Sequence, residues 1–267
     1  MYKAIFIDID GTLRNSNKKI TKNTINSIKN TVQKGILVVL CSGRPKKYTE
    51  EISREVGASS YIITSNGGVI YDYNKNEIIN KVIVERQACV ELYKIAQKFN
   101  TIFTMDIDGL QVTNCKEECY SERIMLDTSI ENFISKNDVL LCTIKDQDFD
   151  KMKKVRKEIE KIDSIEIKQE IKSFGEHNRT DKESIYYFIG SKEVCKGNAI
   201  KHFCALQNID LKDTVAIGDD FNDVSMFEVT GHSVAMGNAS DEIKKYADEI
   251  TLSNDEDGVA KFLEKIN

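Results

Sequence analysis

A short apolar run that ends in two carboxylates, close to the start of the 267-residue chain, most constrains the fold. Ala4 to Ile7 have the composition of a buried strand, and Asp8-Ile-Asp-Gly-Thr12 follows directly. In an open parallel sheet, ligands bind beyond the carboxyl ends of the strands, so polar residues there are candidates for chemistry. The competing interpretation is a strand that ends in a solvated Asp-Gly turn. This motif alone does not decide between the two, because short motifs also occur by chance.

A second apolar run also ends in carboxylates. Thr214 to Gly218 reads as a buried strand and leads into Asp219-Asp-Phe-Asn-Asp223. An isolated buried carboxylate costs on the order of tens of kcal/mol by Born estimates, so several carboxylates at one sheet edge require a cation. Carboxylate oxygens suit Mg²⁺, which takes few protein ligands and completes its octahedron with water and substrate phosphate. The sequence therefore predicts a Mg²⁺ site.

Groups that would hold an anion occur at two further places. The apolar run Ile36 to Leu40 ends in Cys41-Ser-Gly-Arg-Pro45, which presents the Ser42 hydroxyl and the Gly43 amide at the same sheet edge. Lys196 opens a predicted helix, where its positive charge favours an anion. An anionic substrate is therefore expected beside the predicted metal site.

These motifs resemble those of the haloacid dehalogenase-like superfamily and, within it, the Cof-type phosphatases with a large cap. They follow the family's order and span residues 8 to 223, so the resemblance covers nearly the whole chain. The four motifs are Asp8-x-Asp10-Gly-Thr12, Ser42-Gly43-Arg44, Lys196-Gly197 and Gly218-Asp219-Asp220-x-Asn222-Asp223. The resemblance implies a Mg²⁺-dependent hydrolase of phosphoric monoesters that works through an aspartyl phosphate.

The resemblance also implies a role for each motif residue. Asp8 is expected to attack phosphorus, and Asp10 to serve as the acid and then as the base. The expected metal ligands are Asp8, Asp10 through its main-chain carbonyl, Asp219 and Asp223, with Asp220 in or near the same shell. The expected phosphate-binding groups are Ser42, Gly43, Lys196 and Asn222. Two residues could contact substrate or could simply be an exposed arginine and a turn residue, namely Arg44 and Asn66.

Cys41 suggests a different enzyme class, because it stands at a strand end before a glycine and an arginine. Cysteine phosphatases use the spacing Cys-x₅-Arg, whereas the residue six positions after Cys41 is Lys47. We therefore interpret Cys41 as a small apolar residue at the end of a strand.

The order of helices and strands predicts an α/β fold. Between Thr21 and Gly35, Ile25, Ile28 and Val32 recur at helical spacing, so a helix joins the first two strands as a βαβ unit. The alternation continues to the hairpin near residues 69–84 and resumes after Lys196. We expect a Rossmann-like, doubly wound parallel sheet as a discontinuous core of residues 1–84 and 190–267.

Residues 85–189 carry more charge and predict an inserted α+β domain. The resemblance implies that this domain is a cap that closes over the site and selects the leaving group. His177 and Arg179, in a polar loop at 175–182, either face substrate or are solvated. The expected elements are helices at 86–99, near 120–126 and around 149–162, a strand pair within 101–113, and strands at 139–144, 165–172 and 184–189.

The tetrapeptide Asp-Ile-Asp-Gly occurs twice, at residues 8–11 and again at 106–109. The second copy lies between two short β-like arms. Asp-Gly between such arms is a hairpin signal, because both residues tolerate positive φ. We therefore predict a turn, without catalytic function, for the second copy.

Composition limits the partners and the compartment. A net charge of −5 and a pI near 5.5 argue against a nucleic-acid partner. No apolar run approaches the roughly 20 residues of a membrane span. Seven cysteines and a first strand that leaves no room for a signal peptide indicate the reducing cytoplasm. The expected substrate is a small phosphomonoester, a sugar phosphate or a phosphorylated cofactor, and the protein is expected to be a monomer or a homodimer.

Two alternatives to the phosphatase stay open. A phosphomutase of the same superfamily shares the Asp-x-Asp pair and a related cap, and it would depend on a bisphosphate activator. A non-catalytic metabolite-binding relative would keep the fold but turn over no phosphomonoester. The dehalogenases and the ion-pumping ATPases of the superfamily do not fit, because both lack an aspartate at the position of Asp10.

Overall fold

The computed structural model describes residues 2–119, 122–174 and 183–266. The chain divides into two compact units. The first unit comprises Met1–Lys81 with Val194–Asn267, and the second unit comprises Val82–Glu193.

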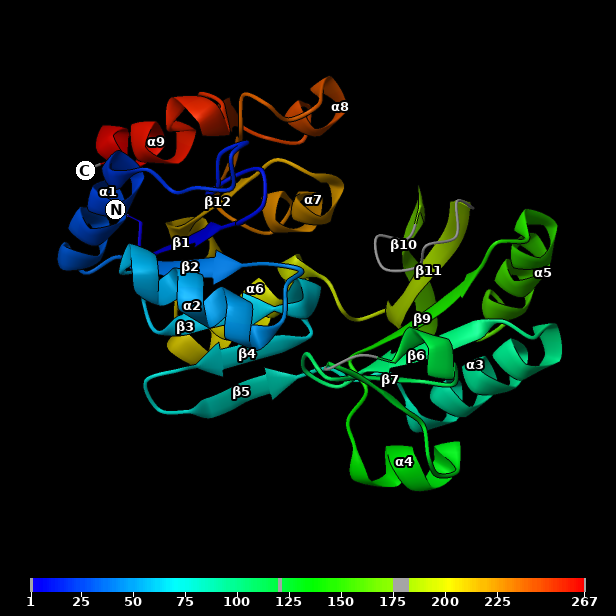
Figure 1. Cartoon of the computed structure of the whole chain (residues 1–267). Helices are drawn as coiled ribbons and strands as arrows, with labels where there is room; N and C mark the ends of the chain where they lie inside the picture. Colours follow the sequence, from blue (N-terminus) through cyan, green and yellow to red (C-terminus); the bar gives the residue numbers. More distant parts are fainter. Residues whose placement is uncertain (1, 120–121, 175–182, 267) are drawn as a thin grey trace. The chain divides into compact units, whose positions relative to one another are not determined.

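The first unit contains an eight-stranded sheet in the order β14-β13-β12-β1-β2-β3-β4-β5. Figure 1 labels the part of this sheet from β12 to β5. From β14 to β3 neighbouring strands are parallel, whereas β4 and β5 add an antiparallel hairpin at one edge. The strands are β1 Ala4–Ile7, β2 Leu37–Cys41, β3 Tyr61–Thr64, β4 Val69–Asp72, β5 Glu77–Lys81, β12 Thr214–Gly218, β13 His232–Ala235 and β14 Glu249–Ile250.

Helices cover both faces of this sheet, because the central strands are apolar on both sides. Ile5 and Ile7 of β1 pack with α1, α2 and α9, while Phe6 points to the other face and packs edge-on against Phe203 of α6. The predicted doubly wound α/β core is therefore confirmed. The helices of the first unit are α1 Lys22–Gln33, α2 Lys46–Val56, α6 Lys196–Gln207, α7 Phe221–Phe227, α8 Asp241–Lys244, α9 Gly258–Ile266 and the short 3₁₀ helices Ser65–Gly67, Leu211–Asp213 and Asn254–Glu256.

Local signals set the ends of the crossover helix α1. The Thr21 hydroxyl accepts a hydrogen bond from the backbone N–H of Thr24 at 3.1 Å, so Thr21 is the N-cap. Gly35, with φ of +82°, ends the helix in a conformation that favours glycine. Ile28, on the face predicted to be apolar, is fully buried.

The second unit is an α+β domain with a six-stranded sheet in the order β10-β11-β9-β6-β7-β8. Alternate residues of β11, Ile185, Tyr187 and Ile189, share one buried cluster with α3, α4 and α5. The strands are β6 Ile102–Asp106, β7 Gln111–Thr113, β8 Arg123–Met125, β9 Leu141–Asp146, β10 Ile165–Phe174 and β11 Glu183–Ser191. The helices are α3 Arg86–Phe99, α4 Ile130–Lys136, α5 Phe149–Ile159 and the 3₁₀ helix Lys116–Glu118.

The structure corrects the sequence prediction at one element of the second unit. The helix predicted near residues 120–126 is wrong, because Arg123–Met125 forms β8, which pairs in parallel with β7. The unpaired edge of β7 offers backbone hydrogen bonds that outweigh the modest helical propensity of this segment. The helix α4 was not predicted, although Ser129 caps it by accepting from the backbone N–H of Asn132.

Two further results concern the predictions of partners and compartment. No helix in the described ranges is long and apolar enough to cross a membrane. All seven cysteines are free thiols. The loop with His177 and Arg179 lies outside the described residues.

Candidate active site

Three neighbouring strands of the first unit end at one edge of the sheet. β1 lies between β12 and β2, and the residues that follow these strands are Asp219, Asp8 and Ser42. The backbone N–H of Asp8 donates to the Ile217 carbonyl at 3.0 Å, so the parallel register extends to the acidic residue itself. Asp8 and Ser42 are buried. The sheet therefore holds these polar side chains close together and largely away from water.

Lys196 is the first residue of α6 and is fully buried. Its Nζ lies 2.6 Å from Asp8 Oδ1 and 2.6 Å from Asp223 Oδ1. Burial by itself lowers the pKa of Lys196, but the carboxylates of Asp223 and Asp8 outweigh burial and raise this pKa, so the side chain is a cation. Burial raises the pKa of the Asp8 carboxyl, and Lys196 opposes that rise. The three groups therefore form one buried, charge-coupled unit.

A strained turn supports the start of α6. Ser65, Asn66 and Gly67 all have positive φ, at 52°, 55° and 99°. A Cβ on Gly67 would lie 2.3 Å from the carbonyl oxygen of Cys195, so only glycine lets the turn approach α6 this closely. Conformations of this kind cost of order 1–3 kcal/mol for a non-glycine residue and cluster at functional sites. The turn thus fixes the position from which Lys196 reaches Asp8.

Asp223, on α7, is fully buried and both of its oxygens have donors. Its Oδ2 accepts from the backbone N–H groups of Asp219 at 2.9 Å and Asp220 at 3.1 Å, and its Oδ1 accepts from Lys196. With Asp220 it forms a capping box at the start of α7. Asp223 therefore fixes the loop that carries Asp219.

The carboxylates form a group that could hold a cation. In the described part of the chain, one oxygen each of Asp8, Asp219 and Asp223 lie within 4.8 Å of one another. Asp219 Oδ1 also accepts from Thr12 Oγ1 at 2.7 Å. Burial, more than the neighbouring carboxylates, raises the pKa of Asp219 to about 6, while Thr12 opposes the rise. An all-oxygen, partly desolvated set of this kind suits a hard divalent cation.

Two amide side chains, those of Asn66 and Asn222, meet near Ser42 and Gly43. Asn222 Nδ2 donates to Asn66 Oδ1 at 3.0 Å, and the Asn66 backbone N–H donates to the Ser42 carbonyl at 3.0 Å. A Cβ on Gly43 would lie 3.0 Å from Asn66 Oδ1. Gly43, Asn66 and Asn222 are thus adjacent, and Asn66 orients the amide of Asn222.

Asp10 belongs to a different cluster from the buried carboxylates. Its Oδ2 accepts from Arg44 Nε at 2.8 Å, and both side chains are roughly half exposed. This hydrogen bond to Asp10 is the main reason that the pKa of Arg44 is raised. The structure therefore separates a buried acidic group at Asp8 from an accessible one at Asp10.

Several contacts in the site involve residues for which the sequence analysis predicted no role. Thr12 hydrogen-bonds to Asp219, Asn238 Nδ2 donates to the Gly11 carbonyl at 2.9 Å, and Arg14 hydrogen-bonds to the Tyr48 hydroxyl. Thr12 belongs to the first motif, so its place two residues after the second aspartate could have predicted a contact in the site. Nothing in the sequence pattern pairs Arg14 with Tyr48, because that contact depends on side-chain packing.

One protein family matches nearly the whole chain. A model of the haloacid dehalogenase-like hydrolases matches residues 5–263. Phosphatase YwpJ of Bacillus subtilis is 27% identical over 99% of this chain and 99% of its own length. A putative phosphatase of Buchnera aphidicola is 30% identical over 99% of this chain and 96% of its own length.

Solved structures resemble the whole chain as well. A haloacid dehalogenase-like hydrolase from Bacteroides thetaiotaomicron is 27% identical, with a TM-score of 0.79 and complete coverage of both chains. The structure of TM0651 from Thermotoga maritima is 25% identical, with a TM-score of 0.82, and covers 100% of this chain and 98% of the other. The similarity to these two structures thus extends over the full length of this chain.

Proposed function

Because the chain belongs to the haloacid dehalogenase-like hydrolase family and is a phosphatase of that family, we propose that it hydrolyses small phosphorylated metabolites through an aspartyl phosphate on Asp8, with Mg²⁺ as cofactor. Sugar phosphates and phosphorylated cofactors are the proposed substrates. The observation that carries the proposal is the buried Lys196, which joins Asp8 to Asp223 beside Asp219.

Asp8 has the surroundings of a nucleophile. Lys196 binds its Oδ1, which leaves Oδ2 to attack phosphorus, and burial excludes water that would compete for the phosphoryl group. A bound Mg²⁺ would supply positive charge that keeps Asp8 ionised and lowers its repulsion of the substrate phosphate. Hydrolysis of the resulting acyl phosphate on Asp8 then restores the carboxylate.

Asp10 is placed to move protons. It stands two residues after Asp8, beyond the buried end of β1, and its carboxylate is accessible. In our proposal it protonates the leaving oxygen and later removes a proton from the attacking water. The separation of the two carboxylates into buried and accessible environments supports this division of roles.

Donors around Ser42 would hold the phosphoryl oxygens. The proposed set is the Ser42 hydroxyl, the Gly43 amide, Lys196 and Asn222, where fixed donors stabilise transition-state charge. Asn66 acts through Asn222, whose amide it orients.

We propose that Asp8, Asp219 and the main-chain carbonyl of Asp10 bind the metal. Asp223 is a further proposed ligand, because one of its oxygens belongs to the same carboxylate group. It also positions Lys196 and the Asp219 loop through the hydrogen bonds that its oxygens accept. We propose residues 85–189 as the cap that selects the leaving group, since this α+β insert interrupts the first unit between the Ser42 and Lys196 motifs.

We propose the cytoplasm as the compartment of this protein. The seven free thiols agree with a reducing cytoplasm.

The test is turnover of a panel of phosphomonoesters by purified protein. We expect phosphate release with Mg²⁺, loss of activity in excess EDTA, and inhibition by Ca²⁺, whose looser and higher coordination misplaces Asp8. Full activity in EDTA would refute the metal role. Activity that requires a bisphosphate activator would favour the phosphomutase, and no turnover on the whole panel would favour the non-catalytic relative.

A further inference from the structure

Two arginines of the first unit lie next to Asp10, Arg14 through its backbone and Arg44 through its side chain. Arg14 forms an isolated backbone bridge with Asp10, and its N–H donates to the Ile9 carbonyl at 2.9 Å. Arg44 binds the Asp10 carboxylate from the other strand end. Arg44 therefore contacts the carboxylate proposed to protonate the leaving oxygen, and the backbone of Arg14 lies next to the same residue.

Tyr48, on α2, connects the two arginines. The guanidinium carbons of Arg14 and Arg44 lie 5.8 Å and 5.3 Å from the centre of its ring, and Arg14 also donates to its hydroxyl. Contacts of this kind fix the planes of both guanidinium groups. The cluster is thus organised before any ligand binds, which reduces the entropic cost of binding one.

Both arginines keep donors for a ligand. Arg44 donates through Nε to Asp10, and in the described part of the chain none of its terminal nitrogens has a hydrogen-bond acceptor. Three of the five N–H groups of Arg14 have acceptors, two of them the Lys18 carbonyl. Arg44 is paired with the single carboxylate of Asp10, and in the described part of the chain the acceptors of the Arg14 side chain are uncharged. The charge of Lys196, in contrast, is neutralised by Asp8 and Asp223.

We propose that Arg14 and Arg44 bind a second anionic group of the substrate, a carboxylate or a further phosphate. This inference rests on the proposed function. Asp10 must come within hydrogen-bond reach of the ester oxygen, and Arg44 is already 2.8 Å from Asp10. We therefore expect the second anionic group near the ester oxygen, because Asp10 acts at hydrogen-bond distance, and test this with a substrate that carries a carboxylate one carbon from that oxygen.

The competing explanation is that Arg14 only braces the loop that ends at Lys18. If Arg14 is only a brace, its replacement should change kcat/KM for all substrates alike. If Arg14 is part of an anion site, its replacement should change kcat/KM only for substrates that carry the second charge. The decisive quantity is thus a ratio between two substrates that differ in that charge alone.

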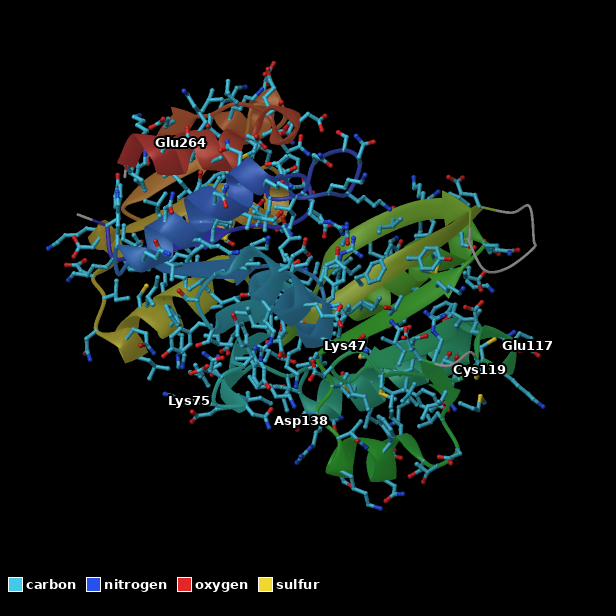
Figure 2. All side chains as sticks on the ribbon, turned by 60° about the vertical axis from the view of Figure 1, so that its left-hand side comes forward. Lys47, Lys75, Glu117, Cys119, Asp138 and Glu264 are labelled. Carbon is cyan, nitrogen blue, oxygen red and sulfur yellow. The ribbon has the colours of Figure 1, made fainter. Side chains whose placement is uncertain are left out.

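The kinetic test compares 2-phosphoglycolate with 2-hydroxyethyl phosphate, in which a neutral hydroxymethyl group replaces the carboxylate. We expect the wild-type protein to prefer 2-phosphoglycolate, and Arg14→Met to lower the ratio of the two kcat/KM values about 10- to 100-fold, the value of charge-assisted hydrogen bonds. Arg14→Lys should restore part of the preference. The control is Lys47→Met, which removes an exposed positive charge at the start of α2 (Figure 2) and should leave the ratio unchanged.

A binding test separates this inference from the proposed function, because it needs no turnover. 3-Phosphonopropionate and 3-hydroxypropylphosphonate, in which a methylene replaces the ester oxygen, are the matching non-hydrolysable pair, and their dissociation constants are measured by calorimetry in excess Mg²⁺. We expect at least about tenfold tighter binding of 3-phosphonopropionate by the wild-type protein and loss of that difference in Arg14→Met. Equal ratios in the wild-type and Arg14→Met proteins, or an equal loss in Lys47→Met, would refute the anion site, whereas lack of turnover alone would refute only the proposed function.

Discussion

The two copies of Asp-Ile-Asp-Gly have the same residues and different surroundings. In residues 8–11, Asp8 continues β1 into the buried site, and Gly11 turns the chain with φ of +87°. In residues 106–109, Asp106 ends β6 and its Oδ1 accepts from the backbone N–H groups of Asp108 and Gly109 at 3.0 and 3.2 Å. The tetrapeptide therefore favours a turn after a strand in both places, and the neighbouring elements decide whether its carboxylates become reactive.

The neighbours differ in charge. Asp8 faces Lys196 and Asp223, which come from helices far along the chain. Burial raises the pKa of Asp106, but the groups that oppose the rise are the amides of its own turn and the side chain of Gln111. A carboxylate that stabilises its own turn needs no cation, and in the described part of the chain the carboxylates grouped to hold a metal are those of Asp8, Asp219 and Asp223.

The largest expected effect is on kcat, when the first aspartate of each copy is replaced by asparagine and the two variants are compared. Asp8→Asn removes the proposed nucleophile and should lower kcat by at least about 10⁴-fold, the scale seen when a nucleophile is lost. Asp106→Asn should leave kcat within a few-fold on a simple phosphomonoester such as p-nitrophenyl phosphate. Steady-state kinetics on that substrate, with Mg²⁺ in excess, measures both.

Opposite behaviour would overturn the assignment of the site. If Asp106→Asn silenced the enzyme on every substrate while Asp8→Asn stayed active, the reaction would take place elsewhere. A change of KM alone in Asp106→Asn, on the natural substrate, is compatible with a cap turn that faces the leaving group.

The second prediction compares the lysines of two buried ion pairs. Lys196→Met removes the donor to Asp8 and should lower kcat/KM by about 10²- to 10³-fold, as does the loss of an oxyanion donor. Lys145 of the second unit lies 2.8 Å from Glu118 Oε1 and is also largely buried, so Lys145→Met is the matched control. It should lower the melting temperature and keep kcat/KM on p-nitrophenyl phosphate within a few-fold. A near-normal rate for Lys196→Met would reduce Lys196 to a structural residue.

The third prediction concerns the glycine of each copy. A Cβ on Gly11 would lie 2.2 Å from Asp219 Oδ2 and would push that carboxylate away, so Gly11→Ala should lower kcat/KM by about 10²-fold, as expected for a displacement near 1 Å. Gly109, with φ of +96°, should lose only about 1–2 kcal/mol of unfolding free energy on substitution by Ala. Urea unfolding measures the loss of unfolding free energy in both variants, and steady-state kinetics measures the loss of kcat/KM. Unchanged activity in Gly11→Ala would show that Asp219 does not need its present position.

Much of the first unit follows from the sequence, because its strands are apolar runs with polar residues at their ends. The bounds of β1 and β12 were predicted to the residue. Parallel strands bring their carboxyl ends to one edge, so the proximity of Asp8 and Asp219 could be argued without coordinates. The turn at 106–109 was predictable because Asp-Gly is among the strongest hairpin signals. The structure confirms it, with positive φ at Asp108 and Gly109.

What could not be predicted depends on contacts between side chains or on competition for a sheet edge. The strand β8 has no apolar alternation, and only pairing with β7 makes it a strand. The sequence identified Asp223 as a candidate metal ligand. It did not reveal that the Asp223 carboxylate accepts hydrogen bonds from two backbone amides and from Lys196. The Arg14–Tyr48 contact follows no periodic pattern, so it emerged only from the packed structure.

The smallest expected effect concerns the residue after each tetrapeptide, Thr12 in the first copy and Leu110 in the second. Thr12 is buried and donates to Asp219 Oδ1 at 2.7 Å, whereas Leu110 is exposed. Thr12→Val keeps the shape of the side chain and removes the donor, so it should weaken Mg²⁺ affinity by about tenfold, the lower end for partners of a metal ligand. The activity at saturating Mg²⁺ should change much less, because Thr12 orients the ligand and does not contact the phosphate. Titration of activity with Mg²⁺ measures this affinity, and Leu110→Ala is the control that should match the wild-type protein. A lower plateau with unchanged Mg²⁺ affinity in Thr12→Val would instead place Thr12 against the substrate.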